Sequence, residues 1–330
     1  MILSVFGWTF ILAVGVLILV KGADFLVDGG GKTAAYLGVP AIVIGLTLVS
    51  FGTSLPELAS SLNALSKGKQ GISVGNVIGS NIANILLVLG VSSLIKPISV
   101  DRKLIKRELP IMFGAMILLA LFASTFYSST YAIKRWEGLL LLIAFIAYIG
   151  FFVWVAFKEG GEKLTDEMTE MEKEEYVNAK EDFDWSPNIL KIIGGLVGIA
   201  VGSEMMIRSA IFYINEFNMI EGVVGLTIIA LATSLPELAA SSVAAFKGEA
   251  DISLGNVIGS NTFNILMVLG ICASIIPLDF SAEIFPSFFI MILVSLFLTS
   301  IIYAGKKITR PVGAVMLGLY FVYIYYMFTV

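Results

Sequence analysis

Long apolar stretches, separated by short polar or turn-rich segments, recur along the whole chain. About 20 consecutive apolar residues are needed for a helix to cross the hydrocarbon core of a bilayer. The pattern predicts ten transmembrane helices, near residues 5–30, 40–66, 74–96, 108–128, 135–157, 189–215, 222–246, 254–277, 283–304 and 310–329. Helices are expected because the bilayer core cannot satisfy open backbone groups, and because the stretches lack the alternation of a barrel wall. The predicted fold class is an all-α membrane protein.

Composition agrees with this prediction and narrows the chemistry. Of the 330 residues, 58% are hydrophobic and 14% are charged, and the mean hydropathy is +0.94. The absence of histidine excludes histidine-based zinc sites, proton relays and Ser-His-Asp triads. The one cysteine, Cys272, excludes an intramolecular disulfide framework. Since no Ser–Lys pair lies within a predicted span either, we expect no enzyme and no cofactor.

The basic residues of the predicted loops fall mainly on one side of the membrane. Only Lys67, Lys69, Lys134 and Arg135 lie in the loops of the poorer side. By the positive-inside rule, the richer side is cytoplasmic. This predicts a multi-pass protein of the cell membrane with both termini outside. The basic residues of the richer side are Lys32, Lys96, Arg102, Lys103, Lys106, Arg107, Lys158, Lys163, Lys173, Lys180, Lys191, Lys247, Lys306, Lys307 and Arg310.

The chain contains two copies of one segment. Residues 45–97 align with 225–277 without a gap, and more than half of the aligned positions are identical. Both copies contain TSLPELA followed by GNVIGSN. Five predicted spans separate each residue from its counterpart, and because five is odd, the second copy should cross the membrane in the opposite direction. Inverted repeats place a substrate site near the midplane; a duplicated scaffold without transport is the alternative.

The repeat divides the chain into two five-helix halves, 1–157 and 189–330. The linker at 158–188 is rich in acidic residues and is predicted to be cytoplasmic. Such a run is typical of a solvated tether or a short surface helix. Weak regulatory binding of calcium is the alternative.

Each repeat places one glutamate deep in an apolar span, Glu57 in the first and Glu237 in the second. An ionised carboxylate in such a place costs on the order of several kcal/mol unless a cation offsets it or a proton neutralises it. No lysine or arginine lies near either glutamate in the sequence. The two readings are therefore a bound cation and a buried, protonated carboxyl.

A proline precedes each glutamate, Pro56 and Pro236. Proline lacks an N–H and clashes with the carbonyl four residues earlier. Freed carbonyls at membrane depth are tolerated where they line a cavity, and they are hard oxygen ligands. The carbonyls expected to lose their helical partners are those of Gly52, Ala232, Ser50 and Ala230.

Further oxygen-bearing side chains recur at a spacing of four residues. Thr53 precedes Glu57 by four, so the hydroxyl and the carboxylate are expected on one helix face. Because every candidate is an oxygen, the set suits hard ions, and two carboxylates with about 6–8 oxygens suit calcium; sodium can use subsets of them. The other candidates are Thr233 with Glu237, the stripe Asn76, Ser80 and Asn84, and its counterpart Asn256, Ser260 and Asn264.

Several neighbouring residues carry less specific signals. Ser54, Ser234, Asn81 and Asn261 fit helix–helix hydrogen bonding and ion contact equally well. The repeated glycines Gly75, Gly79, Gly255 and Gly259 are typical of close helix packing. Asp24 and Glu204 also correspond between the halves, and we expect a structural role for both, with ion binding as the alternative.

The pair GTSLPEL and ATSLPEL, each followed by GNVIGSN, resembles the alpha repeats of the calcium/cation antiporter superfamily, in its prokaryotic sodium/calcium exchanger branch. The resemblance covers essentially the whole chain. It implies ten helices with both termini outside and an antiporter that exchanges Ca²⁺ for Na⁺. The substrates would be these two ions, in a lipid bilayer, with no nucleic acid and no obligatory protein partner.

The resemblance also implies roles for individual residues. Glu57 and Glu237 would be the central carboxylates shared by calcium and sodium. Thr53 and Thr233 would coordinate through hydroxyl and backbone oxygens, and Asn84 and Asn264 would complete the middle. Ser80 and Ser260, with the carbonyls of Ser50 and Ala230, would serve flanking sodium sites.

Three features bear on which ions are used. Ala232 stands where the first copy has Gly52, which should stiffen the second copy. Asn264 stands where some relatives, including potassium-dependent exchangers, carry aspartate, which argues against a potassium requirement. Proton-coupled relatives typically show GNxxE where this chain has TSLPE, which favours sodium. A proton-coupled or potassium-dependent exchanger and a passive cation channel remain the alternatives.

Overall fold

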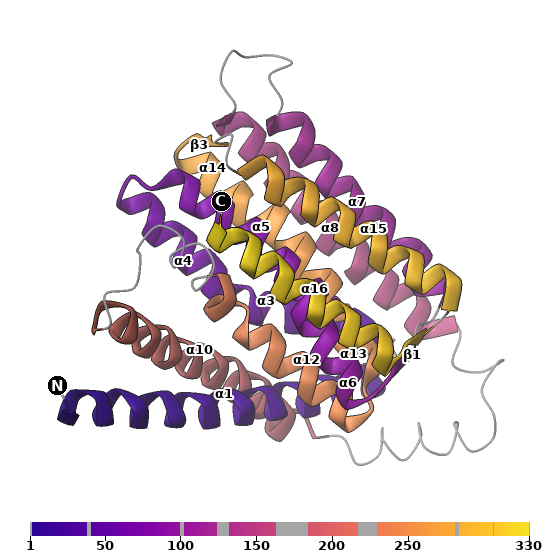
Figure 1. Ribbon diagram of the computed structural model, residues 1–330. Helices are drawn as coiled ribbons and strands as arrows, with labels where there is room; N and C mark the ends of the chain where they lie inside the picture. Colours follow the sequence, from indigo (N-terminus) through magenta and orange to yellow (C-terminus); the bar gives the residue numbers. More distant parts are fainter. Residues whose placement is uncertain are drawn as a thin grey trace.

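The computed structural model describes residues 2–37, 41–99, 102–123, 132–162, 184–216, 230–280, 284–305 and 307–329. Within these ranges the chain is almost entirely helical (Figure 1). Helix overlaps each of the ten predicted spans, although the first part of the span at 222–246 lies outside the described residues.

Seven helical segments of the described chain are long and apolar enough to cross a membrane. The fold is therefore that of a multi-pass helical membrane protein. The segments are Val5–Leu37, Ile42–Ser66, Gln70–Ile95, Arg135–Val155, Trp185–Ser209, Ala250–Ile275 and Phe285–Ala304.

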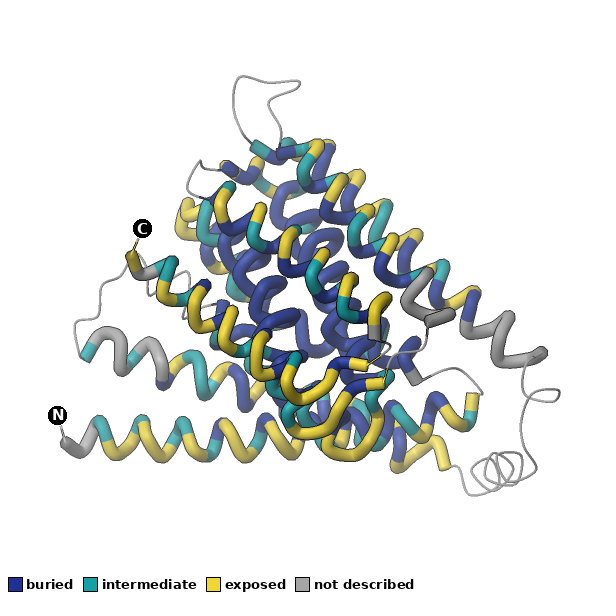
Figure 2. Tube along the Cα trace, turned by 45° about the vertical axis from the view of Figure 1, so that its right-hand side comes forward, coloured by how far each residue is buried: buried dark blue, intermediate teal, exposed yellow. Residues whose placement is uncertain are grey.

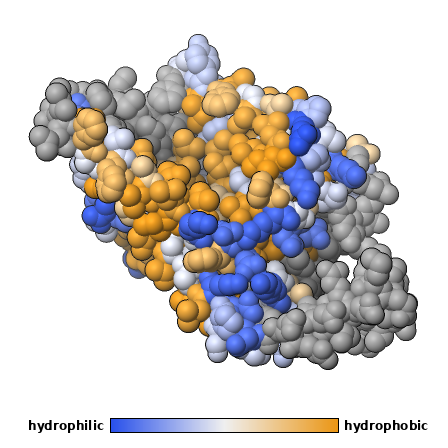
Figure 3. Space-filling view, turned by 90° about the horizontal axis from the view of Figure 1, so that it is seen from below, coloured by the Kyte–Doolittle hydropathy of each residue, from blue (hydrophilic) through white to orange (hydrophobic). Residues whose placement is uncertain are grey.

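Six helices of the described ranges run without a break, and they lie mostly around the outside of the molecule. Four of them contain segments named above, and the most apolar part of each of these segments is only 22–39% buried. The exposed side chains are largely apolar. The face shown in Figure 3 is accordingly mostly hydrophobic, with hydrophilic residues gathered in a band. The six are α1 (Ile2–Leu37), α7 (Arg102–Ala123), α8 (Arg135–Glu162), α10 (Trp185–Glu216), α15 (Phe285–Gly305) and α16 (Arg310–Thr329).

The central spans are interrupted helices. The first consists of α2 (Ala41–Ile44), the π-helical η1 (Gly45–Val49), α3 (Ser50–Thr53) and α4 (Leu55–Ser66). The next consists of α5 (Gln70–Ala83), the π-helical η2 (Asn84–Val88) and α6 (Leu89–Ile95). In the second half their counterparts are helical residues 230–233 with α12 (Leu235–Lys247), and then α13 (Ala250–Phe263), the π-helical η4 (Asn264–Val268) and α14 (Leu269–Ile275).

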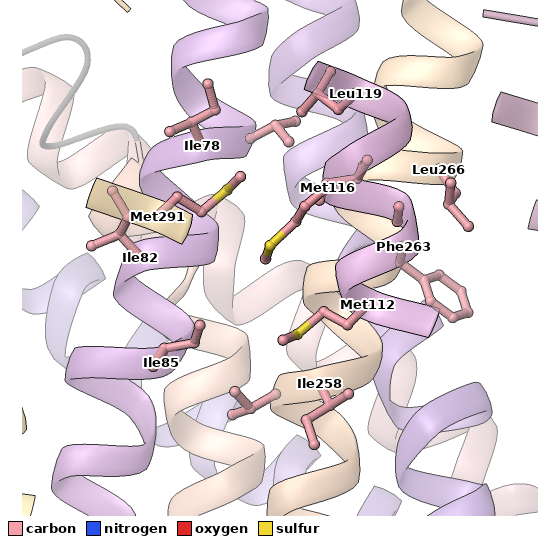
Figure 4. Packing of buried hydrophobic residues seen from close by; sticks show 14 of the residues in the cluster. Ile78, Ile82, Ile85, Met112, Met116, Leu119, Ile258, Phe263, Leu266 and Met291 are labelled. Carbon is pink, nitrogen blue, oxygen red and sulfur yellow. The ribbon is translucent and has the colours of Figure 1, made fainter. Parts of the chain in front are cut away.

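These interrupted helices form the core (Figure 2). The segments Gln70–Ile95 and Ala250–Ile275 are each 83% buried in their most apolar window. Figure 4 shows members of one buried cluster that draws on both halves, among them Ile78 and Ile82 of the first segment, Met116 of α7, Phe263 of the second segment and Met291 of α15. A cluster in which residues from both halves interlock holds the central helices in fixed positions, which a site built from several helices requires.

Two short antiparallel ladders join the halves. β1 (Ile98–Ser99) pairs with β4 (Lys307–Ile308), and β2 (Ala132–Ile133) pairs with β3 (Leu278–Asp279). In Figure 1, β1 and β3 lie at opposite ends of the molecule, and both chain ends are marked on the side of β3. The sequence prediction missed these ladders because two-residue strands leave no period-2 pattern.

Helices α1 and α10 pack side by side through glycines (Figure 1). A Cβ on Gly22 would lie 2.7 Å from the backbone nitrogen of Ile199, and one on Gly202 would lie 2.6 Å from that of Leu19. Only glycine permits such close backbone approach. Ion pairs tie the end of α1 to its neighbours: Asp28 contacts Lys191 at 2.6 Å, and Asp24 contacts Lys247 at 2.6 Å.

Helix enters both ends of the predicted linker at 158–188. α8 continues through Glu162 and α10 begins at Trp185, so helix extends beyond the predicted spans on both sides. Residues 163–183, which carry most of its acidic side chains, lie outside the described residues.

Candidate ion-binding site

A helix break places each central glutamate. Ser54 adopts φ −85° and ψ 0° between α3 and α4, and Ser234 adopts φ −82° and ψ 0° before α12. The prolines two residues later cannot continue the upstream hydrogen-bond ladder. Glu57 and Glu237 consequently lie in the first turn of a new helix. The N-terminal end of a helix carries positive partial charge, which favours an ionised carboxylate there.

Both carboxylates are fully buried. Neither oxygen of Glu57 has a hydrogen-bond partner in the described part of the chain, whereas Oε1 of Glu237 accepts a hydrogen bond from the Ser54 hydroxyl at 3.3 Å. Because Ser54 directly precedes the helix that carries Glu57, its bond to Glu237 brings the beginnings of the two glutamate-bearing helices together. Two buried carboxylates with so few partners form an environment that a cation would stabilise.

A hydroxyl of the first half meets a serine of the second. Thr53 Oγ1 lies 3.3 Å from Ser260 Oγ and donates to Asn256 Oδ1 at 3.1 Å. The same hydroxyl lies 3.4 Å from the carbonyl oxygen of Ser50. Thr53, Ser260 and the Ser50 carbonyl therefore form one oxygen cluster, next to Ser54 and its bond to Glu237.

The second cluster repeats the first with the halves exchanged. Thr233 Oγ1 lies 3.4 Å from Ser80 Oγ and donates to Asn76 Oδ1 at 3.2 Å. It also lies 3.2 Å from the carbonyl oxygen of Ala230. In both clusters the threonine and the serine come from different halves, so each cluster exists only because the halves pack together.

Two cross-half amide pairs complete the site. Asn84 donates from Nδ2 to Asn261 Oδ1 at 3.1 Å, and Asn264 donates from Nδ2 to Asn81 Oδ1 at 3.1 Å. The Oδ1 atoms of Asn84 and Asn264 are buried without a hydrogen-bond partner. These two amide oxygens are available as neutral ligands.

The expectation that the carbonyls of Ser50 and Ala230 lose their helical partners is wrong. Ser54 N donates to the Ser50 oxygen at 3.0 Å, and Ser234 N donates to the Ala230 oxygen at 3.1 Å. Each proline removes the partner of the carbonyl four residues before it. The N–H groups of Ser54 and Ser234 come before the prolines and are therefore still available to the carbonyls of Ser50 and Ala230. Each carbonyl still has a second lone pair for an ion.

Two side chains make contacts that the spacing did not predict. Thr53 precedes the break at Ser54, and its hydroxyl contacts the second half. The Asn76 oxygen lies in the cluster of Thr233 and Ser80, while its amide nitrogen donates to the Glu57 carbonyl and to Ser61 Oγ, at 3.4 and 3.3 Å. The Asn256 nitrogen makes the corresponding contacts in its own half.

Sequence reasoning missed Ser61 and Ser241 altogether and left Ser54 undecided. Ser61 follows Glu57 by four residues, and Ser241 stands at the same place in the second copy. That repeated spacing was a usable signal. The contact of Ser54 with Glu237 had no such signal, because it joins two positions that are 183 residues apart.

Asp24 and Glu204 lie outside these clusters and form ion pairs. Asp24 pairs with Lys247, and Glu204 pairs with Arg208 at 2.6 Å. In the described part of the chain, no three His, Cys, Asp or Glu side chains come together in a way that could hold a metal ion. The site thus combines two carboxylates with neutral hydroxyl, amide and carbonyl oxygens, a donor set for hard cations.

Comparison with known proteins places the chain in a family. The family model described as sodium/calcium exchanger protein matches residues 7–154 and 188–329. CaxA of Alkalimonas amylolytica is 36% identical over 326 residues, covering 97% of this chain and 98% of that protein. The sodium/calcium exchanger MaX1 of Methanosarcina acetivorans is 33% identical over 343 residues, covering 96% and 97%.

A solved structure of the sodium-calcium exchanger NCX_Mj, soaked with sodium and calcium, superposes with a TM-score of 0.78 at 30% identity. The match covers 96% of this chain and 97% of that chain. The sequence motifs, the fold and the two glutamate-bearing helix breaks point the same way. The chain belongs to the sodium/calcium exchanger protein family.

Proposed function

We propose that this antiporter exchanges Ca²⁺ for Na⁺ across the cell membrane by alternating access at the site between its halves. The observation that carries the proposal is the pair Glu57 and Glu237, one from each half, both fully buried and poorly satisfied by the protein. The names of MaX1 and NCX_Mj as sodium/calcium exchangers support the choice of ions.

Charge balance explains how the two ions would compete. With both glutamates ionised, one calcium ion leaves the site neutral, whereas about three sodium ions leave one positive charge. One extra charge crossing the membrane is worth about 2.3 kcal/mol per 100 mV. A negative interior would therefore drive sodium inward and calcium outward.

We assign the ligands as follows. Calcium and a central sodium would use Glu57, Glu237 and the free amide oxygens of Asn84 and Asn264. Flanking sodium ions would use the two oxygen clusters described above, one with Thr53, Ser260 and the Ser50 carbonyl, the other with Thr233, Ser80 and the Ala230 carbonyl.

We further propose ten membrane spans in two inverted halves, with both termini outside and the linker in the cytoplasm. The exchange of partners in the two ladders supports the inversion, because β1 and its counterpart β3 lie at opposite ends. The position of both chain ends on the side of β3, away from β1, supports the even number of spans. The loop charges support the orientation.

The test is uptake of radioactive calcium into proteoliposomes with an outward gradient of sodium, potassium or protons. We expect rapid uptake only with the sodium gradient. Uptake driven by protons in sodium-free vesicles would replace the proposal with a proton-coupled exchanger, and sodium-driven uptake that requires potassium on the calcium side would indicate a potassium-dependent exchanger. Calcium flux with no counter-ion would indicate a passive channel.

A further inference from the structure

We propose that Asn81 and Asn261 are positioning residues, which hold the side-chain amides of Asn84 and Asn264 with their oxygens toward the transported ion. The inference rests on the proposed function and adds to it two residues that are not ligands themselves. Both are fully buried, as are the two asparagines they hold.

An asparagine amide can face a cation in only one useful way. Its oxygen accepts a cation, whereas its NH₂ group carries positive partial charge and repels one. Which end faces the site is decided by the hydrogen bond that the other end makes. Asn261 Oδ1 accepts from Asn84 Nδ2, and Asn81 Oδ1 accepts from Asn264 Nδ2, both at 3.1 Å.

The free ends of the amides support this division of roles. The Oδ1 atoms of Asn84 and Asn264 are buried with no hydrogen-bond partner, while those of Asn81 and Asn261 are occupied. An unpartnered buried polar oxygen costs about 1–3 kcal/mol when nothing binds to it. A cation bound there removes that cost.

The backbone places Asn84 and Asn264 against the helices that carry the glutamates of the opposite half. Asn84 opens η2, which packs against α12, the helix of Glu237. Asn264 opens η4, which packs against α4, the helix of Glu57. π-helical turns are frequent at functional sites because the extra residue redirects a side chain.

One of the two positioning residues is itself anchored. Asn81 Nδ2 donates to the carbonyl oxygen of Asn261 at 3.3 Å, so only its oxygen is left for Asn264. Asn261 Nδ2 is buried without a hydrogen-bond partner. We therefore expect that Asn81 holds its partner more firmly than Asn261 does.

The test compares leucine with aspartate at each position, using radioactive calcium binding to the purified full-length protein in sodium-free buffer. Leucine has a similar size but no acceptor, so Asn81→Leu and Asn261→Leu should weaken calcium binding about tenfold or more. Asn81→Asp and Asn261→Asp keep the acceptor oxygen and should bind at least as tightly as the unchanged chain. Aspartate variants that bind as weakly as the leucine variants would overturn the inference.

A double substitution separates positioning from general damage to the fold. If Asn261 acts only through Asn84, then Asn261→Leu should change calcium affinity less than twofold when Asn84 is already alanine. Full additivity of the two effects would show that Asn261 acts independently, which contradicts the inference. The unchanged chain distinguishes the two proposals. If the unchanged chain exchanges calcium for sodium while Asn261→Leu binds calcium normally, only this inference fails. If the unchanged chain neither binds calcium nor exchanges it for sodium, the proposed function fails as well.

Discussion

The two halves of the site share their geometry but not all of their supporting residues. Ser54 and Ser234 make the same backbone turn, and each threonine cluster has its counterpart. Two of the aligned differences close to the break change the contacts of the site. Ser50 corresponds to Ala230, and Gly52 corresponds to Ala232.

The first difference adds a hydrogen bond to one half only. The Ser50 hydroxyl lies 2.7 Å from the Gly45 carbonyl oxygen and 3.0 Å from that of Asn256, and alanine at 230 cannot make either contact. Gly259 leaves the space that this hydroxyl occupies. Ser50 thereby connects α3 directly to α13, the helix that carries Ser260.

The second difference concerns space. A Cβ on Gly52 would overlap Leu196 Cδ2 of α10, whereas Ala232 carries that Cβ in the other half. The comparison teaches that the ligands are duplicated while the packing around them is not. We therefore expect the two oxygen clusters to bind sodium unequally, and the predictions below begin with the feature that the halves share.

The largest effect should come from the glutamates. Glu57→Gln and Glu237→Gln each remove half of the fixed charge, so each should lower sodium-driven calcium uptake at least about 100-fold, a loss of about 2.7 kcal/mol or more in ion binding. Uptake assays in proteoliposomes measure this. A normal rate in either variant would show that the halves do not share one ion.

Gly52→Ala should destabilise the protein, because the added Cβ would clash with Leu196. The reverse change in the other half, Ala232→Gly, adds no atom and should cause no clash. Overpacking in a tight interior costs about 1–3 kcal/mol. The thermal unfolding midpoint in detergent should fall for Gly52→Ala and recover when Leu196→Ala is added. A midpoint that the second substitution leaves unchanged would rule out the contact with Leu196 as the cause.

Ser50→Ala should weaken sodium binding more than calcium binding. Loss of one buried hydrogen bond costs about 1 kcal/mol, which corresponds to roughly a fivefold change in affinity. The sodium concentration for half-maximal exchange should rise, with little change for calcium. Ala230→Ser is the matched control; an equal rise in both variants would indicate that the hydroxyl has no special place in the first half.

The smallest effect should come from the acidic pair Asp24 and Glu204. Asp24 joins α1 to α12 through Lys247, whereas Glu204 contacts Arg208 within its own helix. Partly exposed ion pairs contribute about 0–1 kcal/mol. We expect Asp24→Asn to lower the unfolding midpoint slightly and Glu204→Gln to leave it unchanged; a larger drop for Glu204→Gln would reverse this ranking.

Much of the arrangement could be predicted from sequence because its signals are local or repeated. Apolar length located the helices, and the identity of the two copies singled out Glu57 and Glu237 together with their prolines. Contacts between the halves could not be predicted, since Thr53 and Ser260 lie 207 positions apart and nothing in their spacing pairs them. The π-helical turns also escaped prediction, because one extra residue in a turn hardly changes an apolar run.

The failure to predict the Ser50 carbonyl has a specific physical cause. The proline rule was applied two residues too far upstream, where the Ser54 N–H still reaches its helical partner. The different hydrogen bonding of Asn81 and Asn84 was equally hidden, because identical residue types differ here only in which end of the amide is already bonded.

The exchange of partners in the ladders and in the oxygen clusters has a consequence for the origin of the chain. A protein made of one half alone would hold one strand of each ladder type, one threonine and one serine that belong to different clusters, and a single carboxylate. It could have formed a working site only by meeting a second copy of itself inserted the other way round. Gene duplication would then have joined an assembly that already existed.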